Sequence, residues 1–209
     1  MRVYVYVDGF NLYYRALKNT PYKWINLDVL AQRLLSKKED RVEKIRYFTA
    51  RVSPRAGDID APRRQQILLS ALGSLPNLDI HYGRFLSKTK RRPLVGSHPP
   101  QFVEVHDTEE KGSDVNLAAH LLHDGWHKRY DVALVLSQDT DLVEPLRMVS
   151  EELGLLVGLV WLDQSKANGA LSKAASFVRH LKRSDLAASQ FPNPLVMLDG
   201  RQLYKPTEW

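Results

Sequence analysis

The strongest constraint on the fold is an alternation between short apolar runs and stretches whose apolar residues recur at helical spacing. The runs VYVYV at 3–7 and VALVL at 132–136 contain no charged residue. Continuous apolar runs of this length are typical of strands buried on both faces of a parallel sheet, with helices as crossovers. The sequence therefore predicts an α/β fold. We expect an open doubly wound, mainly parallel sheet of about five strands, with helices on both faces.

The same patterns predict where the individual elements lie. Strands are expected at 3–7, 42–52, 78–86, 130–138 and 155–162, and helices at 10–17, 25–35, 61–75, 112–129, 140–154 and 169–181. Residues 87–101 are rich in Pro, Gly and basic residues and are expected to form a loop. A short strand at 102–107 would pair back on the third strand, so a hairpin or loop insertion is expected around 86–108.

Two regions differ in their patterning and define the predicted domain organisation. Residues 1–183 carry the alternating pattern and are expected to form one domain. Residues 184–209 contain Pro192, Pro194 and Pro206 and show no clear period. This tail is expected to be a docking arm or to be partly disordered.

Composition narrows the functional classes. The 209 residues include 30 Lys and Arg against 24 Asp and Glu, a formal charge of +6. That excess favours a polyanionic partner such as nucleic acid, and an ordinary basic surface explains it equally well. The absence of cysteine excludes disulfides, thiolate zinc sites and thiol catalysis. No apolar run is long enough to span a bilayer, so a cytoplasmic location without membrane contact is expected.

Acidic residues follow two of the predicted strands where those strands end. Asp8 ends the first strand, and Asp139 and Asp141 come directly after the fourth. In doubly wound folds the ligand crevice lies at the carboxyl ends of the strands, so these side chains are expected to meet there. Asp114, at the start of a predicted helix, joins them if the preceding insertion returns the chain to that edge.

Clustered carboxylates repel one another unless a cation neutralises them, which points to one or two Mg²⁺ or Mn²⁺ ions. Helix capping offers an alternative explanation for the same residues. Asp8 and Asn11 could cap the helix after the first strand, and Ser137 with Asp139 and Asp141 could cap the helix after the fourth. Asp114 could be an ordinary first-turn acid. Capping explains each residue singly, whereas a metal site also explains why they gather at one edge.

Three segments resemble a known family. The segments are YVYVDGFNLYY, EKGSDVNLAAHLL and ALVLSQDTDLVEPL. In this order they resemble the NYN branch of the PIN-like nucleases, especially its LabA-like bacterial members, and the resemblance covers residues 1 to about 181. It implies a PIN-like, Rossmann-like fold with a carboxylate-bound Mg²⁺ or Mn²⁺ site. It also implies metal-dependent endonucleolytic cleavage of RNA that leaves a 5′-phosphate and a 3′-hydroxyl.

The resemblance also assigns roles to individual residues. It implies that the metal ligands and catalytic acids are Asp8, Asp114, Asp139 and Asp141. Asn11 would orient Asp8 or a water molecule, Ser137 precedes the final acidic pair, and Lys111 would contact a phosphate. Two positions depart from the family pattern. Gln138 replaces a small residue, and Ala175 and Ser176 stand where relatives often place an acid, which puts a second metal ion in doubt.

Basic, aromatic and histidine residues near the motifs each have two explanations. Lys88, Lys90, Arg91 and Arg92 would contact an RNA backbone or belong to a solvated loop. Tyr13, Tyr14, Tyr22 and Trp24 would stack on unpaired bases, although packing at the sheet edge is the favoured explanation. Three histidines at helical spacing suggest zinc, but with no evident fourth ligand we expect unligated imidazoles; they are His120, His123 and His127.

The sequence is also compatible with functions other than that of a ribonuclease. A non-catalytic RNA-binding or regulatory module would share the fold, as would a toxin with an antitoxin-like or regulatory protein partner, and a homodimer is compatible with each. A haloacid dehalogenase-like phosphatase ranks lower, because Phe10 stands where that chemistry requires a second acid.

Overall fold

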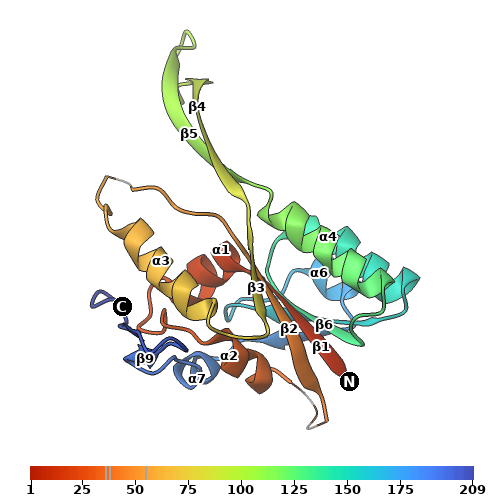
Figure 1. The fold of residues 1–209 in the computed structure, drawn as a ribbon. Coiled ribbons are helices and arrows are strands. Elements are labelled where there is room, and N and C mark those ends of the chain that lie inside the picture. Colours follow the sequence, from red (N-terminus) through yellow and green to blue (C-terminus); the bar gives the residue numbers. More distant parts are fainter. Residues whose placement is uncertain (36, 38, 55) are drawn as a thin grey trace.

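A six-stranded parallel sheet forms the centre of the computed structural model, which describes residues 1–35, 37, 39–54 and 56–209 (Figure 1). The strand order is β3-β2-β1-β6-β7-β8, and every neighbouring pair is parallel. The strands are β1 (Arg2–Asp8), β2 (Arg41–Thr49), β3 (Leu78–Tyr82), β6 (Val132–Leu136), β7 (Leu156–Trp161) and β8 (Phe177–His180). The strand order reverses between β1 and β6, which is where such folds bind ligands. The predicted doubly wound α/β class is confirmed.

Helices cover both faces of the sheet. They are α1 (Gly9–Asn11), the π-helix η1 (Leu12–Leu17), α2 (Leu27–Arg33), α3 (Ala61–Leu72), α4 (Ser113–Trp126), the 3₁₀ turn η2 (Thr140–Leu142), α5 (Val143–Arg147), the π-helix η3 (Met148–Glu152), α6 (Gly169–Ala174) and α7 (Arg183–Ala187). None of the helices within the described part of the chain has the length and apolarity needed to cross a membrane.

Strand β1 shows how the sheet separates two apolar cores. Val3, Val5 and Val7 point to the core that includes α2 and α3, whereas Tyr6 points to the core that includes α4. Alternate side chains of a strand face opposite sides of the sheet, so an uninterrupted apolar run is required when both sides are covered. This explains why the VYVYV segment identifies the central strand.

A long antiparallel hairpin corrects two sequence predictions. The sequence predicts a loop over residues 87–101, but β4 (Arg84–Pro93) is a strand that pairs with β5 (Phe102–Lys111) over its whole length. The segment 102–107, predicted to pair with the third strand, pairs with β4 instead. Opposite charges across the two strands compensate the basic run, since Lys90 pairs with Asp107 and Glu109. The hairpin projects away from the sheet (Figure 1).

The end of the alternating region differs from the prediction as well. The sequence predicts a single helix over 169–181, but α6 ends at Ala174 and β8 begins at Phe177 as a sixth strand. Ser176 accepts a hydrogen bond from the Val157 amide, which ties this segment to the start of β7. Gly158 lets β8 pack here, because a Cβ at that position would lie 2.3 Å from the Phe177 ring.

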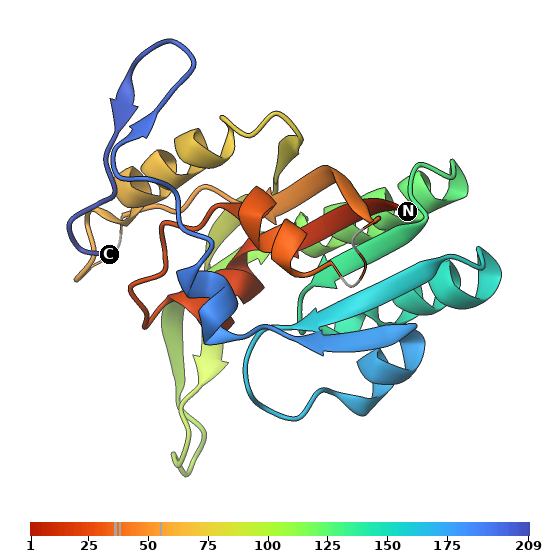
Figure 2. The same cartoon turned by 90° about the horizontal axis from the view of Figure 1, so that it is seen from below.

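The C-terminal residues lie against the core rather than apart from it. The indole of Trp24 donates to the Pro192 carbonyl (3.0 Å), and its ring centroid lies 5.5 Å from that of Phe191 and 6.5 Å from that of Trp209. The short strands β9 (Leu195–Val196) and β10 (Gln202–Leu203) form a small hairpin beside α3 (Figure 2). Trp24 is therefore a packing residue, as favoured from the sequence.

Candidate functional site

Asp8 lies at the carboxyl end of β1 and is almost completely buried, with 2% of its surface exposed. One carboxylate oxygen accepts from the Asn11 amide (2.9 Å), and the other accepts from the Asn11 side chain (2.5 Å) and from the Ser137 hydroxyl (3.0 Å). Burial raises the pKa of Asp8, these hydrogen bonds lower it, and the charge of Asp139 raises it further. The carboxylate is thus held in one orientation beside a second acid.

Ser137 connects the ends of β1 and β6. Its hydroxyl donates to Asp8 and accepts from the Asp139 amide (3.1 Å), so Asp8 and Asp139 share one small hydrogen-bonded turn. The Asn11 side-chain oxygen accepts from the Gln138 amide (3.3 Å), a second bond across the same gap. The two strand ends meet at one edge, as the sequence predicts. Capping is also present, because Asp139 accepts from the Asp141 amide (2.9 Å).

Asp114 lies in the first turn of α4, and its pKa shows the influence of the other acids nearby. The pKa of Asp114 is raised to about 6, first by burial and then by the charges of Asp8, Asp139, Glu110 and Asp141. Burial and neighbouring acids both disfavour the ionised form of a carboxyl group and so raise its pKa. Shifts of this kind concentrate at functional sites.

A buried ion network fixes α4, and hence Asp114, against the sheet. Asp124, fully buried near the other end of α4, accepts from the Arg46 guanidinium on β2 (2.7 and 3.0 Å) and from the Tyr6 hydroxyl on β1 (2.8 Å). Arg129 completes the network at 2.9 Å. Since a buried charge is tolerated only with such partners, the position of the helix is strongly specified.

Glu110 is a further acid of the site that the sequence patterns did not identify. It lies on β5 and accepts from the Ser113 hydroxyl (2.6 Å) and amide (3.2 Å) at the start of α4. Strand alternation turns Glu110 to the opposite face from Glu109 and Lys111. Its position three residues before the first residue of α4 could have identified it from the sequence. That inference would have required a strand to be predicted up to Lys111, so that Glu110 lies next to the start of the helix.

The four acids line one pocket of about 200 Å³ at the carboxyl edge of the sheet. Its lining residues are Asp8, Phe10, Asn11, Tyr14, Phe85, Glu110, Ser113, Asp114 and Asp139. Below, this is called the carboxylate pocket. The hairpin reaches it because Gly83 lacks a side chain, since a Cβ there would lie 2.7 Å from the Lys111 carbonyl.

Some predicted site residues lie outside the pocket. Asp141 is exposed and does not line the pocket, although its charge raises the pKa of Asp114. Lys111 is exposed and pairs with Glu109 at 2.8 Å. The predicted basic residues all lie on β4, away from the carboxylate pocket; they are Lys88, Lys90, Arg91 and Arg92. Of these, Lys88 and Lys90 already have acidic partners, and Arg91 lies 4.9 Å from the centre of the Phe102 ring.

The structure shows where the residues that depart from the family pattern lie relative to the carboxylate pocket. Gln138 is buried, and with its side-chain oxygen and nitrogen exchanged it would donate to Asp163 (3.2 Å) and accept from the Trp161 indole (2.7 Å). Ser176 lies at the amino end of β8, whereas the carboxylate pocket lies at the carboxyl edge of the parallel sheet. The absence of an acid at Ser176 therefore has no bearing on this pocket.

The side chains of the pocket do not form a ready-made metal cage. Across residues 1–35, 37, 39–54 and 56–209, no group of three or more histidine or acidic side chains is arranged to hold a metal ion. Of the three histidines considered for zinc, His120 and His123 lie on α4 and His127 directly follows it. His120 packs against His81 (4.1 Å between ring centroids) and His123 against His127 (4.2 Å). The carboxylate pocket has the oxygen donors that a divalent cation prefers, but these must move together to bind one.

A doubly wound sheet that gathers acids at the ends of β1 and β6 and at the start of α4 defines a PIN-like, nuclease-like domain. The chain belongs to the NYN domain family, which it matches over residues 2–182. This confirms the resemblance of the sequence motifs to the NYN branch.

The chain is similar to a curated protein and to a solved structure. The 6-hydroxy-3-succinoylpyridine 3-monooxygenase HspA of Pseudomonas putida is 29% identical over 238 aligned residues, which cover 100% of this chain and 75% of that protein. The crystal structure of a protein of unknown function from Vibrio parahaemolyticus superposes with a TM-score of 0.54 at 13% identity, covering 87% of this chain and 93% of the other. The second similarity shows the fold alone.

Proposed function

We propose that this protein is a Mg²⁺- or Mn²⁺-dependent endoribonuclease and that the carboxylate pocket is its catalytic site. The observation that carries the proposal is the convergence of Asp8, Glu110, Asp114 and Asp139 in one pocket. The raised pKa of Asp114, to about 6, supports it, because burial and the charges of the neighbouring acids disfavour the ionised form, which a bound cation would favour. NYN membership favours a nuclease over the phosphatase alternative.

The residues that would hold the ion are Asp8, Asp114 and Asp139, with Glu110 as a fourth donor and Asp141 at the rim. When bound, the ion would supply polarisation of a phosphate oxygen and activation of water for attack at phosphorus. Asn11 and Ser137 act as positioning residues, because their hydrogen bonds set the orientation of the Asp8 carboxylate.

Contacts to the RNA strand would come from the hairpin. The residues predicted to contact phosphates are Lys88, Lys90, Arg91, Arg92 and Lys111. Arg91 and Arg92 have no acidic partner among the described residues, so they would bind phosphates at a lower cost than Lys90, which is paired with Asp107 and Glu109. The products would carry a 5′-phosphate and a 3′-hydroxyl.

The test is cleavage of a 5′-labelled single-stranded RNA by purified protein with Mn²⁺, Mg²⁺ or EDTA. We expect cleavage that requires the divalent ion and falls at least about 100-fold in both Asp8→Asn and Asp139→Asn. Asp199→Asn, which changes an exposed acid in the distal β9–β10 hairpin, serves as the matched control and should be fully active. Isothermal titration of Mn²⁺ should lose binding in the same two variants.

Two outcomes would contradict the assignment. Equal cleavage by the wild type and both pocket variants would identify a contaminant. Metal-independent RNA binding without cleavage under any of these conditions would instead support the non-catalytic RNA-binding module.

A second candidate activity is oxygenation of a hydroxylated heteroaromatic ring, favoured by the similarity to HspA over the whole chain and by an aromatic cavity beside the carboxylate pocket. Such a reaction inserts one oxygen atom of O₂ and needs two electrons from a reduced cofactor to convert the other to water. The test is oxygen uptake by the protein with 6-hydroxy-3-succinoylpyridine and NADH. Uptake that depends on the pyridine would support this candidate, and its absence would exclude it for that substrate and donor.

A further inference from the structure

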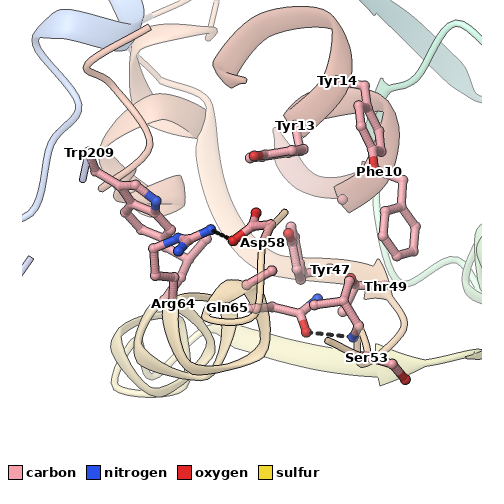
Figure 3. Close-up of a pocket in the computed structure, with 14 residues that line it drawn as sticks. Phe10, Tyr13, Tyr14, Tyr47, Thr49, Ser53, Asp58, Arg64, Gln65 and Trp209 are labelled. Atoms are coloured by element: carbon pink, nitrogen blue, oxygen red, sulfur yellow. Dashed lines mark hydrogen bonds and ion pairs between the residues drawn. The ribbon is translucent and has the colours of Figure 1, made fainter. Parts of the chain in front are cut away.

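A cavity of about 140 Å³ adjoins the carboxylate pocket and has several aromatic rings in its walls (Figure 3). Below, it is called the aromatic cavity, and its ring-bearing residues are Phe10, Tyr13, Tyr14, Tyr47 and Trp209. Five segments contribute to it: α1 with η1, β2, the connection that follows β2, α3, and the C-terminal residue Trp209. Helices, a strand and a connection from separate parts of the chain therefore build its walls.

The aromatic cavity and the carboxylate pocket share two of their walls. Phe10 and Tyr14 line both. They lie next to each other at one end of the aromatic cavity (Figure 3), and Phe10 also packs edge-on against Phe85 at the base of the hairpin, 5.6 Å between centroids. Tyr14 is 51% exposed, so a large aromatic face is open to a ligand that enters from the carboxylate side.

Gly9 explains why the two sites are adjacent. It follows Asp8 directly and forms part of the cavity floor against Tyr47. A Cβ at Gly9 would lie 2.6 Å from the Tyr47 ring and 2.8 Å from the Phe48 carbonyl. One residue step along the chain therefore separates the central carboxylate of one site from the floor of the other.

Polar groups stand at one side of this apolar cavity. Arg64 pairs with Asp58, and Tyr13 lies close enough for both charges to affect it: its pKa is raised by burial, by Tyr14 and by Asp58, and lowered by Arg64. Figure 3 shows Tyr13, Asp58 and Arg64 in sequence along one wall. An apolar slot with a few polar groups at its edge is the usual form of a site for a flat heteroaromatic ring.

The size of the cavity fits one six-membered ring. Apolar cavities of about 150 Å³ accommodate benzene, so 140 Å³ holds a single ring more readily than a fused pair. Stacking of an RNA base on aromatic side chains strengthens binding by about 5- to 150-fold per base. The net charge of +6 favours a polyanionic strand as the molecule that presents the ring.

We infer that the aromatic cavity binds one unpaired pyrimidine base of an RNA strand whose phosphate lies at the carboxylate pocket. The inference deepens the proposed ribonuclease function and rests on it for the identity of the strand. Tyr14 and Phe10 separate the bound base from the acids, so the base and the adjoining phosphate are held together at two neighbouring positions. The cavity thus selects which linkage lies at the acids.

The test measures binding separately from cleavage. Fluorescence anisotropy of labelled oligouridine is recorded in Ca²⁺ with EDTA-treated protein, next to oligoadenosine and next to oligouridines that carry one abasic position each. We expect oligouridine to bind at least about fivefold more tightly than oligoadenosine, and a single abasic position to weaken binding about fivefold or more.

Two variants and a control locate the effect. Tyr14→Ala removes an exposed ring, and Ala61→Leu fills the cavity from the start of α3; each should weaken oligouridine binding about fivefold or more. Tyr204→Ala, which removes a similarly exposed tyrosine away from both sites, should bind as the wild type does. In Tyr14→Ala the abasic penalty should disappear, because the ring and the base act as one contact.

The outcomes separate this inference from the proposed function. Suppose that RNA is cleaved, but that Tyr14→Ala and the abasic position either do not weaken oligouridine binding or weaken it independently of each other. The base site is then wrong, and the proposed ribonuclease function is unaffected. If oligouridine binds through Tyr14 but is never cleaved, the base site stands and the ribonuclease is wrong. Binding of a free hydroxypyridine in the cavity that RNA does not compete with would overturn the base assignment.

Discussion

At the scale of the residue, the carboxylate pocket depends on the hydrogen bonds that hold Asp8 at the end of β1. Asp8 accepts three hydrogen bonds, two from Asn11 and one from Ser137, so a single carboxylate is fixed by residues from two distant parts of the chain. Capping and site formation are not alternatives at Asp8, since the same carboxylate caps α1 and lines the pocket. From the sequence, capping and a metal site were alternative explanations for Asp8; the structure shows that a capping carboxylate can also line the pocket.

Gly9→Ala tests how tightly this turn is packed. Alanine favours helices, but its Cβ would approach Tyr47 and the Phe48 carbonyl, so we expect a loss of about 1–3 kcal/mol in the free energy of unfolding. Urea denaturation measures the loss. Gly169→Ala is the matched control: Gly169 is also the first residue of a helix after a capping residue, and nothing lies within 4 Å of its added Cβ. Equal stability of the two variants would contradict the prediction.

The shifted pKa of Asp114 predicts how stability depends on pH. Between pH about 4 and about 6 the folded state keeps a proton that the unfolded state has released, because its pKa is raised from 3.8 to about 6. The contribution of Asp114 to stability without metal therefore falls as pH rises through this window. A divalent ion that binds the ionised carboxylate removes the penalty.

We therefore expect Mn²⁺ to raise the melting temperature more at pH 7.5 than at pH 5, where protons compete with the ion. Differential scanning fluorimetry with and without Mn²⁺ measures the two shifts. In Asp114→Asn the shift should be small at both values of pH. A shift in the wild type that is equal or larger at pH 5 would contradict metal binding by Asp114.

At the scale of the element, the hairpin carries different sets of side chains on its two faces. Phe85 and Glu110 at its base face the carboxylate pocket, whereas Lys90 and Lys111 face away and pair with acids of β5. A strand turns successive side chains to opposite faces, so neighbouring charged residues such as Glu109 and Glu110 have different roles. The outer part of the hairpin does not line the pocket and can be removed in a test.

Replacing residues 88–107 with Asn-Gly would close the hairpin after the Ser87–Thr108 pair, which already forms a cross-strand hydrogen bond (3.0 Å). We expect the melting temperature and Mn²⁺ binding to be retained and RNA affinity to fall. The slope of log K against log salt concentration should decrease by about 0.7 for each phosphate that the shortened protein no longer neutralises, hence by about 1.4 for Arg91 and Arg92 together.

Point variants refine the same measurement. The double variant Arg91→Gln, Arg92→Gln should reproduce most of the change in slope. Lys90→Gln should change the slope less, since Lys90 is already paired with Asp107 and Glu109. An unchanged slope after removal of the outer hairpin would show that RNA does not bind there.

At the scale of the whole molecule, the C-terminal segment completes one of the two cores. Phe191 is 5% exposed and packs on Trp24, and the Asn26 amide donates to the Ser189 carbonyl (2.8 Å). Trp209 walls the aromatic cavity. The core beneath η1 and α2 thus depends on residues far along the chain.

Phe191→Ala is expected to lower the free energy of unfolding by about 3–5 kcal/mol, because it opens a cavity beside Trp24. Leu198→Ala, at a fully exposed position between β9 and β10, should change it by less than about 0.5 kcal/mol. Urea denaturation followed by tryptophan fluorescence compares the two. If Phe191→Ala leaves the free energy of unfolding unchanged, the C-terminal segment is not part of the cooperative core.

Local patterns in the sequence were enough to predict the sheet and the position of its central acids. Apolar runs without charges identify strands buried on both faces, and the residues that follow them, Asp8 and Asp139, are then expected at one edge. These inferences need only short segments and the rule that parallel strands end on the same side. The same segments also carried the family resemblance.

The sequence also predicted a hairpin or loop insertion around 86–108, and the structure confirms the hairpin. The sixth strand, the full extent and pairing of the hairpin, the position of Glu110 and the aromatic cavity became visible only in the folded chain. Each depends on pairing or contact between residues far apart: β8 is a strand because β7 offers it an open edge, and the basic run extends because β5 supplies opposite charges. The cavity is formed by Tyr14, Tyr47 and Trp209, which share no local pattern. Local propensity cannot encode such contacts, because their free energy arises only when the fold has brought the segments together.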